Sequence, residues 1–189
     1  ASVDLSRLPR HVAAAVVASE DGAFFFHDGF DWGAICKALD GPDSKDGKPK
    51  RGGSSITQQV ARNVFLWQKR SWVRKGLEAW YTVLLESLLS KERILEVYLD
   101  VAEFGPGAFG VESGARLHFG RPADKLSHEQ AARLAAILPS PNKWRVGGET
   151  ASKRVEFVAR NRPPWPGEAG FAQARERWRA AARGPCLPW

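Results

Sequence analysis

The sequence predicts a mainly α-helical fold, in which one sizeable core is arranged in one or two lobes. Several stretches repeat apolar residues at the three- and four-residue spacing of a helix that buries one face. Serine residues stand where these helices would begin, and glycine or proline where they would end. No stretch shows the alternation of a strand, and no tandem repeat is visible. At 189 residues the chain is too short for several independent domains.

The formal net charge of +7 favours an anionic partner, which could be nucleic acid, a membrane surface or a phosphorylated substrate. A solvated basic face is the alternative. The eight tryptophans point to a surface where apolar and polar surroundings meet, membrane surfaces included. No apolar run is long enough to span a bilayer. Because the chain starts at Ala1 and contains no methionine, we expect a processed or trimmed piece from which an anchor could have been removed.

The first predicted helix carries a carboxylate at its end. Residues 1–8 are expected to be extended or coiled, the proline that follows can open a helix, and an alanine and valine run continues it. Glu20 and Asp21 end this helix, ahead of the aromatic residues 24–26. Burial against those aromatic side chains would raise the pKa of an acid, whereas a solvated helix end would leave it ordinary.

Residues 40–53 are polar and rich in glycine and proline, which predicts an exposed loop that is either a flap over a cleft or a plain connector. The stretch 52–78 then brings hydroxyls, adjacent amides and a cluster of cations. Such groups donate charge-assisted hydrogen bonds to phosphate oxygens, so we expect this stretch to hold a diphosphate while an acid elsewhere performs the chemistry. The amides and cations concerned are Gln58, Gln59, Arg62, Lys69, Arg70, Arg74 and Lys75.

A long and deeply packed helix is predicted from Ser71 onward, because apolar residues recur at helical spacing as far as Leu88. Arg74 and Glu78 share one face of this helix, and a surface ion pair is the default interpretation of such a pair. Ordinary core packing is the alternative for Trp72. The apolar residues that could meet a lipid chain or a membrane are Phe65, Leu66, Trp67 and Trp72.

Further helices are predicted wherever a capping residue precedes a periodic apolar run. Ser90 can cap one of them, and Ser127 with Gln130 forms a capping box before another. A glycine-rich turn lies over 103–110 and does not fit a phosphate loop. The predicted helical ranges are 91–99, 111–119, 128–138 and 152–160, followed in a C-terminal tail (163–189) by a basic amphipathic helix over 171–183. This last helix could pack on the body of the protein, lie on a membrane or be loose.

Five motifs between residues 20 and 141 resemble, in order, those of the peptidoglycan glycosyltransferases. The segments 65–78 and 101–105 are similar in particular to the monofunctional members, which lack a penicillin-binding transpeptidase domain. The resemblance fades beyond residue 162. The motifs are Glu20-Asp-x-x-Phe-x-x-His27, Gly52-Gly-Ser-Ser-Ile-Thr-Gln-Gln59, Arg74-Lys-x-x-Glu78, Lys91-x-x-Ile-Leu-Glu-x-Tyr98 and, for the fifth, Gly107-x-x-Gly110 with the Leu-Pro-x-Pro turn at 138–141.

The resemblance implies a lysozyme-like, two-lobed helical glycosyltransferase domain over residues 1–162. It implies polymerisation of lipid II, a disaccharide pentapeptide on undecaprenyl diphosphate, into β-1,4 glycan strands of the bacterial cell wall. The expected partners are lipid II, the growing glycan strand, a membrane surface and cell-wall synthesis proteins, with no nucleic acid. The expected location is the periplasmic (outer) face of the bacterial cytoplasmic (inner) membrane. Family members usually carry an N-terminal anchor, whose absence here fits a trimmed chain.

By the same resemblance, Glu20 is the general base on the acceptor 4-hydroxyl, and the inversion at the donor sugar means one direct displacement. Glu78 is the second catalytic residue: it orients Arg74 and Lys75, or holds a divalent cation (Mg or Mn) against the diphosphate. General acid catalysis by Glu78 is less favoured, because a neutralised diphosphate leaves readily. No organic cofactor is expected. The residues expected to bind substrate are Ser54, Thr57, Gln58, Gln59, Arg62, Asn63, Arg70, Arg74 and Lys75.

Three positions depart from the family pattern without removing a proposed catalytic group. Ser55 replaces a threonine and keeps the hydroxyl. Arg62 replaces a lysine, which keeps the charge but offers a planar fork in place of a point charge. Asp100 replaces an asparagine, where we expect a change in local hydrogen bonding.

Two rival classes remain. A lysozyme-like hydrolase also needs a glutamate in a cleft, but it has no need of the cations in 62–75 and commonly pairs two carboxylates across the scissile bond. A non-catalytic basic module for nucleic acid or anionic lipid would spread its charge along a face, and Glu20 would be dispensable.

Overall fold

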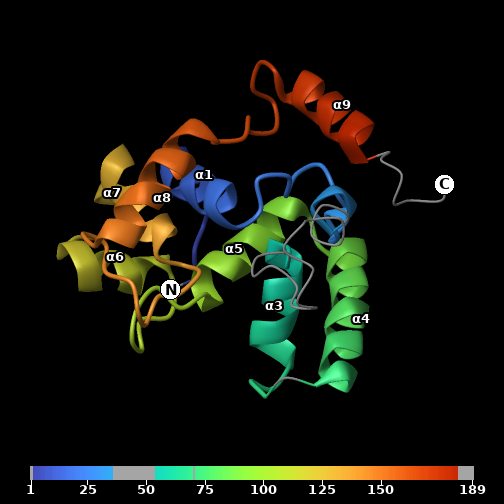
Figure 1. Cartoon of the computed structure of the whole chain (residues 1–189), viewed down its shortest axis with the longest axis horizontal. Helices are drawn as coiled ribbons and strands as arrows, with labels where there is room; N and C mark the ends of the chain where they lie inside the picture. The colour runs from blue at the N-terminus through green and yellow to red at the C-terminus, as the bar shows by residue number, and fades with distance from the viewer. Residues whose placement is uncertain (1, 36–53, 70, 183–189) are drawn as a thin grey trace.

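The computed structural model describes residues 2–35, 54–69 and 71–182. Within these ranges the regular structure is helical, apart from one isolated bridge between Glu103 and Phe109, so the predicted mainly α fold class is confirmed. The loop predicted at 40–53 lies outside the described residues. The helices are α1 (Arg10–Glu20), α3 (Ile56–Phe65), α4 (Trp72–Leu88), α5 (Lys91–Val101), α6 (Val111–Phe119), the 3-10 turn η2 (Ala123–Lys125), α7 (His128–Ala136), α8 (Glu149–Arg160) and α9 (Phe171–Ala182) (Figure 1).

The helices form two groups that α5 connects (Figure 1). In one group, α3 packs against α4 and α5. In the other, α1 packs against α7 and α8, and α6 joins α5 to α7. No helix in the described ranges is long and apolar enough to cross a membrane. Because α1 and α3 belong to different groups, the side chains at their adjoining ends meet where the groups come together.

The helix α1 lies in the core because its side chains are small. All residues from Val12 to Ala18 are buried, and α7, on which the helix packs, is also rich in buried alanine. Small side chains let two helices approach closely and fill the space between them. The helix ends at Glu20, and the amide of Asp21 donates to the carbonyl of Val17. The predicted delivery of the carboxylate at the end of a buried helix is confirmed.

Ser55 caps α3 and also holds the loop that follows α1. Its hydroxyl accepts a hydrogen bond from the amide of Gln58 and donates to the carbonyl of Gly29 at 2.5 Å. Gly29 has a φ of 84°, and a Cβ at this position would lie 2.5 Å from Cγ2 of Thr82 on α4. Both the backbone conformation and the close contact therefore require glycine here.

The helix α4 departs from the prediction, because it turns its polar face inward. Its buried residues are Arg74, Glu78, Thr82 and Leu85, which recur at helical spacing on the side that packs against α3. The expectation of a deeply packed apolar face is wrong, as is core packing for Trp72, which is 93% exposed. The exposed apolar residues of α4 are Trp72, Val73, Leu77, Trp80, Val83 and Leu88.

The predicted helix starts at Ser71, Ser90 and Ser127 are confirmed. Each of these serines accepts a hydrogen bond from the amide three residues further on, which satisfies one of the free donors of the first turn. The helix α8 begins at Glu149 rather than at residue 152, with Gly148 before it. Asp100, the residue that replaces the usual asparagine, accepts a hydrogen bond from the amide of Val3 at 2.9 Å.

Candidate active site

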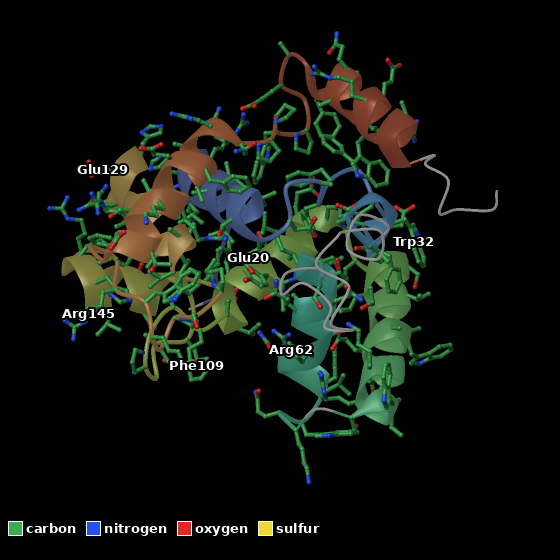
Figure 2. All side chains as sticks on the ribbon, in the orientation of Figure 1. Glu20, Trp32, Arg62, Phe109, Glu129 and Arg145 are labelled. Atoms are coloured by element: carbon green, nitrogen blue, oxygen red, sulfur yellow. The ribbon has the colours of Figure 1, made fainter. Side chains whose placement is uncertain are left out.

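Glu20 lies at the end of α1, near the middle of the molecule between the two helix groups (Figure 2). Its carboxylate oxygen Oε2 accepts a hydrogen bond from Nε2 of Gln59 on α3 at 3.1 Å. The other oxygen, Oε1, lies 3.3 Å from the hydroxyl of Ser19. Two of the residues singled out in the sequence, Glu20 and Gln59, are therefore in direct contact across the junction between the groups.

Burial raises the pKa of Glu20 above its ordinary value of 4.5, because the loss of water disfavours the charged carboxylate. The hydrogen bond from Gln59, the positive charge of Arg154 and the hydroxyl of Ser19 act in the opposite direction. Gln59 comes from α3, Arg154 from α8 and Ser19 from α1 itself. The ring of Phe24, one of the aromatic residues expected to bury the acid, lies under Nζ of Lys91. A carboxylate under such opposing influences can be ionised at neutral pH and still bind a proton well, as a general base requires.

Tyr98 on α5 fixes the orientation of Gln59. Its hydroxyl donates to Oε1 of Gln59 at 3.4 Å, which leaves the amide nitrogen to face Glu20. Burial, with the nearby charge of Glu20, raises the pKa of Tyr98 well above its ordinary value of 10.0, so the phenol remains a donor. The sequence placed Tyr98 in a motif but gave no reason to assign it this contact.

Arg154 is the residue near Glu20 that the sequence analysis missed. It comes from α8, and its Nη2 donates to the carbonyl of Ser19 at 3.0 Å and to the hydroxyl at 3.1 Å. The hydroxyl of Ser19 also donates to the carbonyl of Ala135 at 2.8 Å. Because Arg154 and Ser19 are 135 residues apart in the chain, no local pattern could connect them.

Two pockets adjoin the contact between Glu20 and Gln59. The larger, of about 370 Å³, includes Gln59 in its lining, and the smaller, of about 210 Å³, includes Glu20. Since the two side chains are hydrogen bonded, one pair of residues faces both pockets. The other polar side chains in the lining of the larger pocket are Arg62, Asn63, Gln68, Arg74, Tyr98 and Glu103, a set suited to an anionic ligand with several oxygen acceptors.

Glu78 is buried on the inward face of α4 between two cations. Nη1 of Arg74 donates to its Oε2 at 3.0 Å, and Nζ of Lys75 contacts its Oε1. The side chains of Arg74 and Glu78 are 10% and 2% exposed, so the default interpretation as a surface ion pair is wrong. Arg74 also lines the larger pocket. The position of Glu78 fits the orientation of Arg74 toward that pocket.

A divalent cation at Glu78 stays a prediction, and the surroundings of this carboxylate are cationic. Both carboxylate oxygens are engaged by Arg74 and Lys75. In the part of the chain that the structure describes, no three His, Cys, Asp or Glu side chains gather closely enough to hold a metal ion. The positive charges that line the larger pocket are those of Arg62 and Arg74.

Three of the other predicted substrate-binding residues line the pockets. Arg62 and Asn63 line the larger pocket, where Nε of Arg62 donates to Oδ1 of Asn63 at 3.3 Å. Figure 2 shows Arg62 on α3, below Glu20 in that view. Ser54 lines the smaller pocket with Glu20. Arg70 lies outside the described residues.

Thr57 and Gln58 are engaged elsewhere. Thr57 is fully buried, and its hydroxyl donates to Oε1 of Glu86 at 2.5 Å, an oxygen that also accepts from Lys91 at 2.7 Å. Gln58 is buried and accepts from the amide of Ser55 to close the capping box of α3. Thr57 therefore joins α3 to α4, and Gln58 closes the cap of its own helix. The substrate contact predicted for both residues stays a prediction.

Asp21, next to Glu20, ties three segments together. Its two carboxylate oxygens lie 2.9 and 3.1 Å from Nε2 of His27, and Oδ2 accepts from the amide of Ile56 at 3.0 Å. Ile56 is the first residue of α3, where a negative charge is favourable. The end of α1, the loop after it and the start of α3 thus meet at one buried carboxylate, next to Glu20.

The fold and the site define a class of protein: a mainly helical domain in which one desolvated glutamate adjoins a pocket lined by arginine. The family model described as Transglycosylase matches residues 1–162, and the chain belongs to this family. The resemblance read from the five sequence motifs is confirmed at this level.

Several relatives carry the description "biosynthetic peptidoglycan transglycosylase". The protein of Pseudomonas aeruginosa is 56% identical over 159 residues, which cover 84% of this chain and 65% of the relative. The protein of Shewanella amazonensis is 48% identical over 160 residues, covering 84% and 64%. That of Chromohalobacter salexigens is 53% identical over 148 residues, covering 77% and 62%. This chain therefore spans less than two thirds of the length of each relative.

Proposed function

We propose that this chain is a peptidoglycan glycosyltransferase, which polymerises lipid II into β-1,4 glycan strands for the bacterial cell wall. The observation that carries the proposal is the desolvated Glu20, hydrogen bonded to Gln59 at the edge of a pocket that Arg62 and Arg74 line. Membership of the transglycosylase family and the descriptions of the relatives support it.

In the proposed reaction, Glu20 is the general base. It takes the proton from the 4-hydroxyl of the acceptor sugar while that oxygen bonds to the anomeric carbon of the donor. The bond from this carbon to the diphosphate oxygen breaks, and undecaprenyl diphosphate leaves with the electron pair. Attack opposite the α-linked leaving group gives the β link in one step. Gln59, held by Tyr98, keeps the carboxylate in place for the transfer.

The departing diphosphate is stabilised by cations that the fold holds ready. Arg62 and Arg74 line the larger pocket, and the guanidinium of Arg74 is held by Glu78. Fixed donors placed where charge develops lower the barrier, because they need no reorganisation during the reaction. Lys75, whose side chain is 46% exposed, can reach out from Glu78 to the same ligand. No step of this mechanism passes through a metal ion.

We also propose that the chain works on the periplasmic face of the bacterial inner membrane, with the outward face of α4 against the lipid. That face exposes Trp72, Val73, Trp80 and Val83. Tryptophan favours the headgroup level of a bilayer, and the net charge of +7 adds attraction to anionic lipids. A lipid-linked diphosphate would then lie at the level of the cations that begin α4.

The deciding experiment is polymerisation of purified lipid II by this chain and by Glu20→Gln, in detergent and with binding of a donor analogue measured in parallel. We expect glycan strands from the parent chain and a rate at least 100-fold lower from the variant, since general base catalysis contributes about 10²–10⁴-fold. Donor binding should be retained, because glutamine preserves the shape of the side chain.

Two other outcomes would overturn the proposal. Cleavage of preformed glycan by the parent chain, without any polymer, would identify a hydrolase. Equal turnover by the parent chain and Glu20→Gln would show that Glu20 is not the base.

Assays with added Mg²⁺ or Mn²⁺ and with a chelator should give the same rate. A strict requirement for metal would contradict the proposal that arginine and lysine stabilise the leaving diphosphate.

A further inference from the structure

The C-terminal segment 163–182 folds back onto the loop that follows Glu20, although it lies beyond the stretch that the family model matches. Its helix, α9, forms one edge of the molecule (Figure 1). On this helix Phe171, Ala174 and Trp178 are partly buried and lie on one face at helical spacing. The residues between them are exposed, Arg175 and Arg177 included. The helix therefore has an inward face with two aromatic side chains.

Three aromatic residues of this segment contact three consecutive residues of the loop. The ring of Trp165 lies 5.0 Å from that of Phe25, at an interplanar angle of 66°. The ring of Phe171 lies 5.2 Å from that of Phe26. The third pair is Trp178 and His27, whose ring centroids are 6.2 Å apart at 50°. Contacts of this kind, repeated in register, hold the loop along its length.

The segment is anchored at its start. The side chain of Trp165 packs against the hydrophobic core, and its amide donates to Oε2 of Glu168 at 2.9 Å. Oε1 of Glu168 lies 3.8 Å from Nη1 of Arg10, the first residue of α1. The segment is thus attached to one end of α1 and reaches the loop at the other end, where Glu20 lies.

His27 transmits this contact to the site. Its Nε2 hydrogen bonds to Asp21, which also accepts from the amide of Ile56 at the start of α3. On its other side, Nδ1 is buried and has no hydrogen-bond partner among the described residues. The imidazole is therefore fixed by hydrogen bonds on one side only, and the nearby ring of Trp178 limits its rotation by packing.

We propose that residues 163–182 form a strap that positions the catalytic carboxylate, and that Trp178 is a positioning residue which acts through His27 and Asp21. This inference rests on the proposed function, because Glu20 is the residue to be placed. Asp21 follows Glu20 directly and fixes the start of α3, the helix that carries Gln59. Loosening of the strap would shift Glu20 relative to Gln59 without removing any group that lines the two pockets beside them.

The test compares Trp178→Ala, Trp178→Phe and the control Arg177→Ala, which changes the exposed face of the same helix. Two quantities are measured on the full chain: kcat and KM for lipid II polymerisation, and amide hydrogen exchange along the backbone. For Trp178→Ala we expect kcat to fall roughly tenfold or more with KM within about twofold, because small displacements of a catalytic group are costly. Exchange should rise in residues 22–30 and 54–58 and stay unchanged in α7 and α8. Trp178→Phe should recover most of kcat, and Arg177→Ala should match the parent.

The exchange measurement needs no activity, so the two proposals fail separately. A parent chain that does not polymerise would remove the proposed function, and the strap would then be judged by exchange in residues 22–30 alone. Unchanged exchange there in Trp178→Ala would overturn the strap, and so would raised exchange with kcat at the parent value. A rise in exchange throughout the molecule would also overturn it, because Trp178 would then support general stability and not the position of Glu20.

Discussion

At the scale of single residues, the ionisation of Glu20 depends most directly on Gln59, whose hydrogen bond is the strongest influence that opposes burial. In Gln59→Leu this bond is lost, and the pKa of Glu20 rises further. Because the base must be ionised to act, the acid limb of the pH–rate profile should move to higher pH. At any pH on that limb the rate should therefore be lower than that of the parent chain. The measurement is the initial rate of lipid II polymerisation as a function of pH.

The control for this prediction is Asn63→Ala. Asn63 lines the same pocket but contacts Arg62 and not Glu20. Its substitution should alter substrate binding and leave the acid limb in place. An acid limb that stays where it is in Gln59→Leu would show that the amide does not stabilise the ionised carboxylate.

The buried pair of Arg74 and Glu78 makes a prediction about stability. Glu78→Gln leaves the guanidinium of Arg74 buried beside a neutral group, and the free energy of unfolding should fall by about 3–5 kcal/mol. The double variant Arg74→Met/Glu78→Leu should recover most of this lost stability, since apolar residues can replace a buried ion pair. It should not polymerise lipid II, because it lacks the guanidinium of Arg74. Urea denaturation followed by circular dichroism measures both effects.

The matched control is Lys75→Gln, which removes the half-exposed partner of the same glutamate. It should lower the free energy of unfolding by less than about 1 kcal/mol, as expected for an ion pair in contact with water. Equal losses of unfolding free energy in Lys75→Gln and Glu78→Gln would mean that water hydrates the guanidinium of Arg74 in the folded protein.

At the scale of helices, the sequence predicted where most of them begin. Serines 71, 90 and 127 cap helices as predicted, and their effect is local because each satisfies an amide three residues away. Ser55 caps α3 in the same way, but no helix was predicted over 56–65. The start of α8 was missed by a few residues, since the cap position there is a glycine without a side-chain acceptor. Local chemistry thus determines the boundaries of these helices largely independently of their neighbours.

Which face of α4 is buried could not be read in the same way. The periodicity shows that one face of α4 is apolar, and in a globular protein such a face normally packs against the core. The inward face instead carries Arg74, Glu78 and Thr82, which pair with each other and with the backbone. This orientation depends on the packing of α4 against α3. For α4, the face that is buried is therefore determined by its tertiary partner and not by its own periodicity.

The outward face of α4 should matter for membrane binding and little for stability. We expect Trp72→Ser/Trp80→Ser to keep the free energy of unfolding within about 0.5 kcal/mol of the parent, because both side chains are exposed. Binding to vesicles with anionic lipid should weaken at least tenfold, since each lost indole removes a large apolar area from the lipid contact. Sedimentation with vesicles and urea denaturation give the two quantities.

The comparison variant is Leu117→Ser, which removes an exposed apolar side chain from α6 in the other helix group. Its vesicle binding should equal that of the parent. If both variants bind vesicles like the parent chain, the membrane contact does not involve α4.

At the scale of the whole molecule, the site is assembled from parts that the sequence could show only separately. Glu20, Gln59 and Arg74 lie in motifs whose residue types and spacing predict a chemical role. Arg154 has no such motif, and its role depends on α8 packing against α1. The motifs therefore contain the proposed catalytic residues but not Arg154, whose charge acts on Glu20 only after the helix groups have come together.

The contact between Arg154 and Ser19 also bears on how the protein is made. A ribosome releases the chain from its N-terminus, so Glu20, Gln59 and Tyr98 emerge well before α8 does. Until residue 154 has been synthesised, the hydrogen bonds that join α8 to the end of α1 cannot form. Contacts between such distant parts of a chain are also among the slowest to form. The order of translation therefore keeps a growing chain from completing the surroundings of Glu20 until α8 has been synthesised.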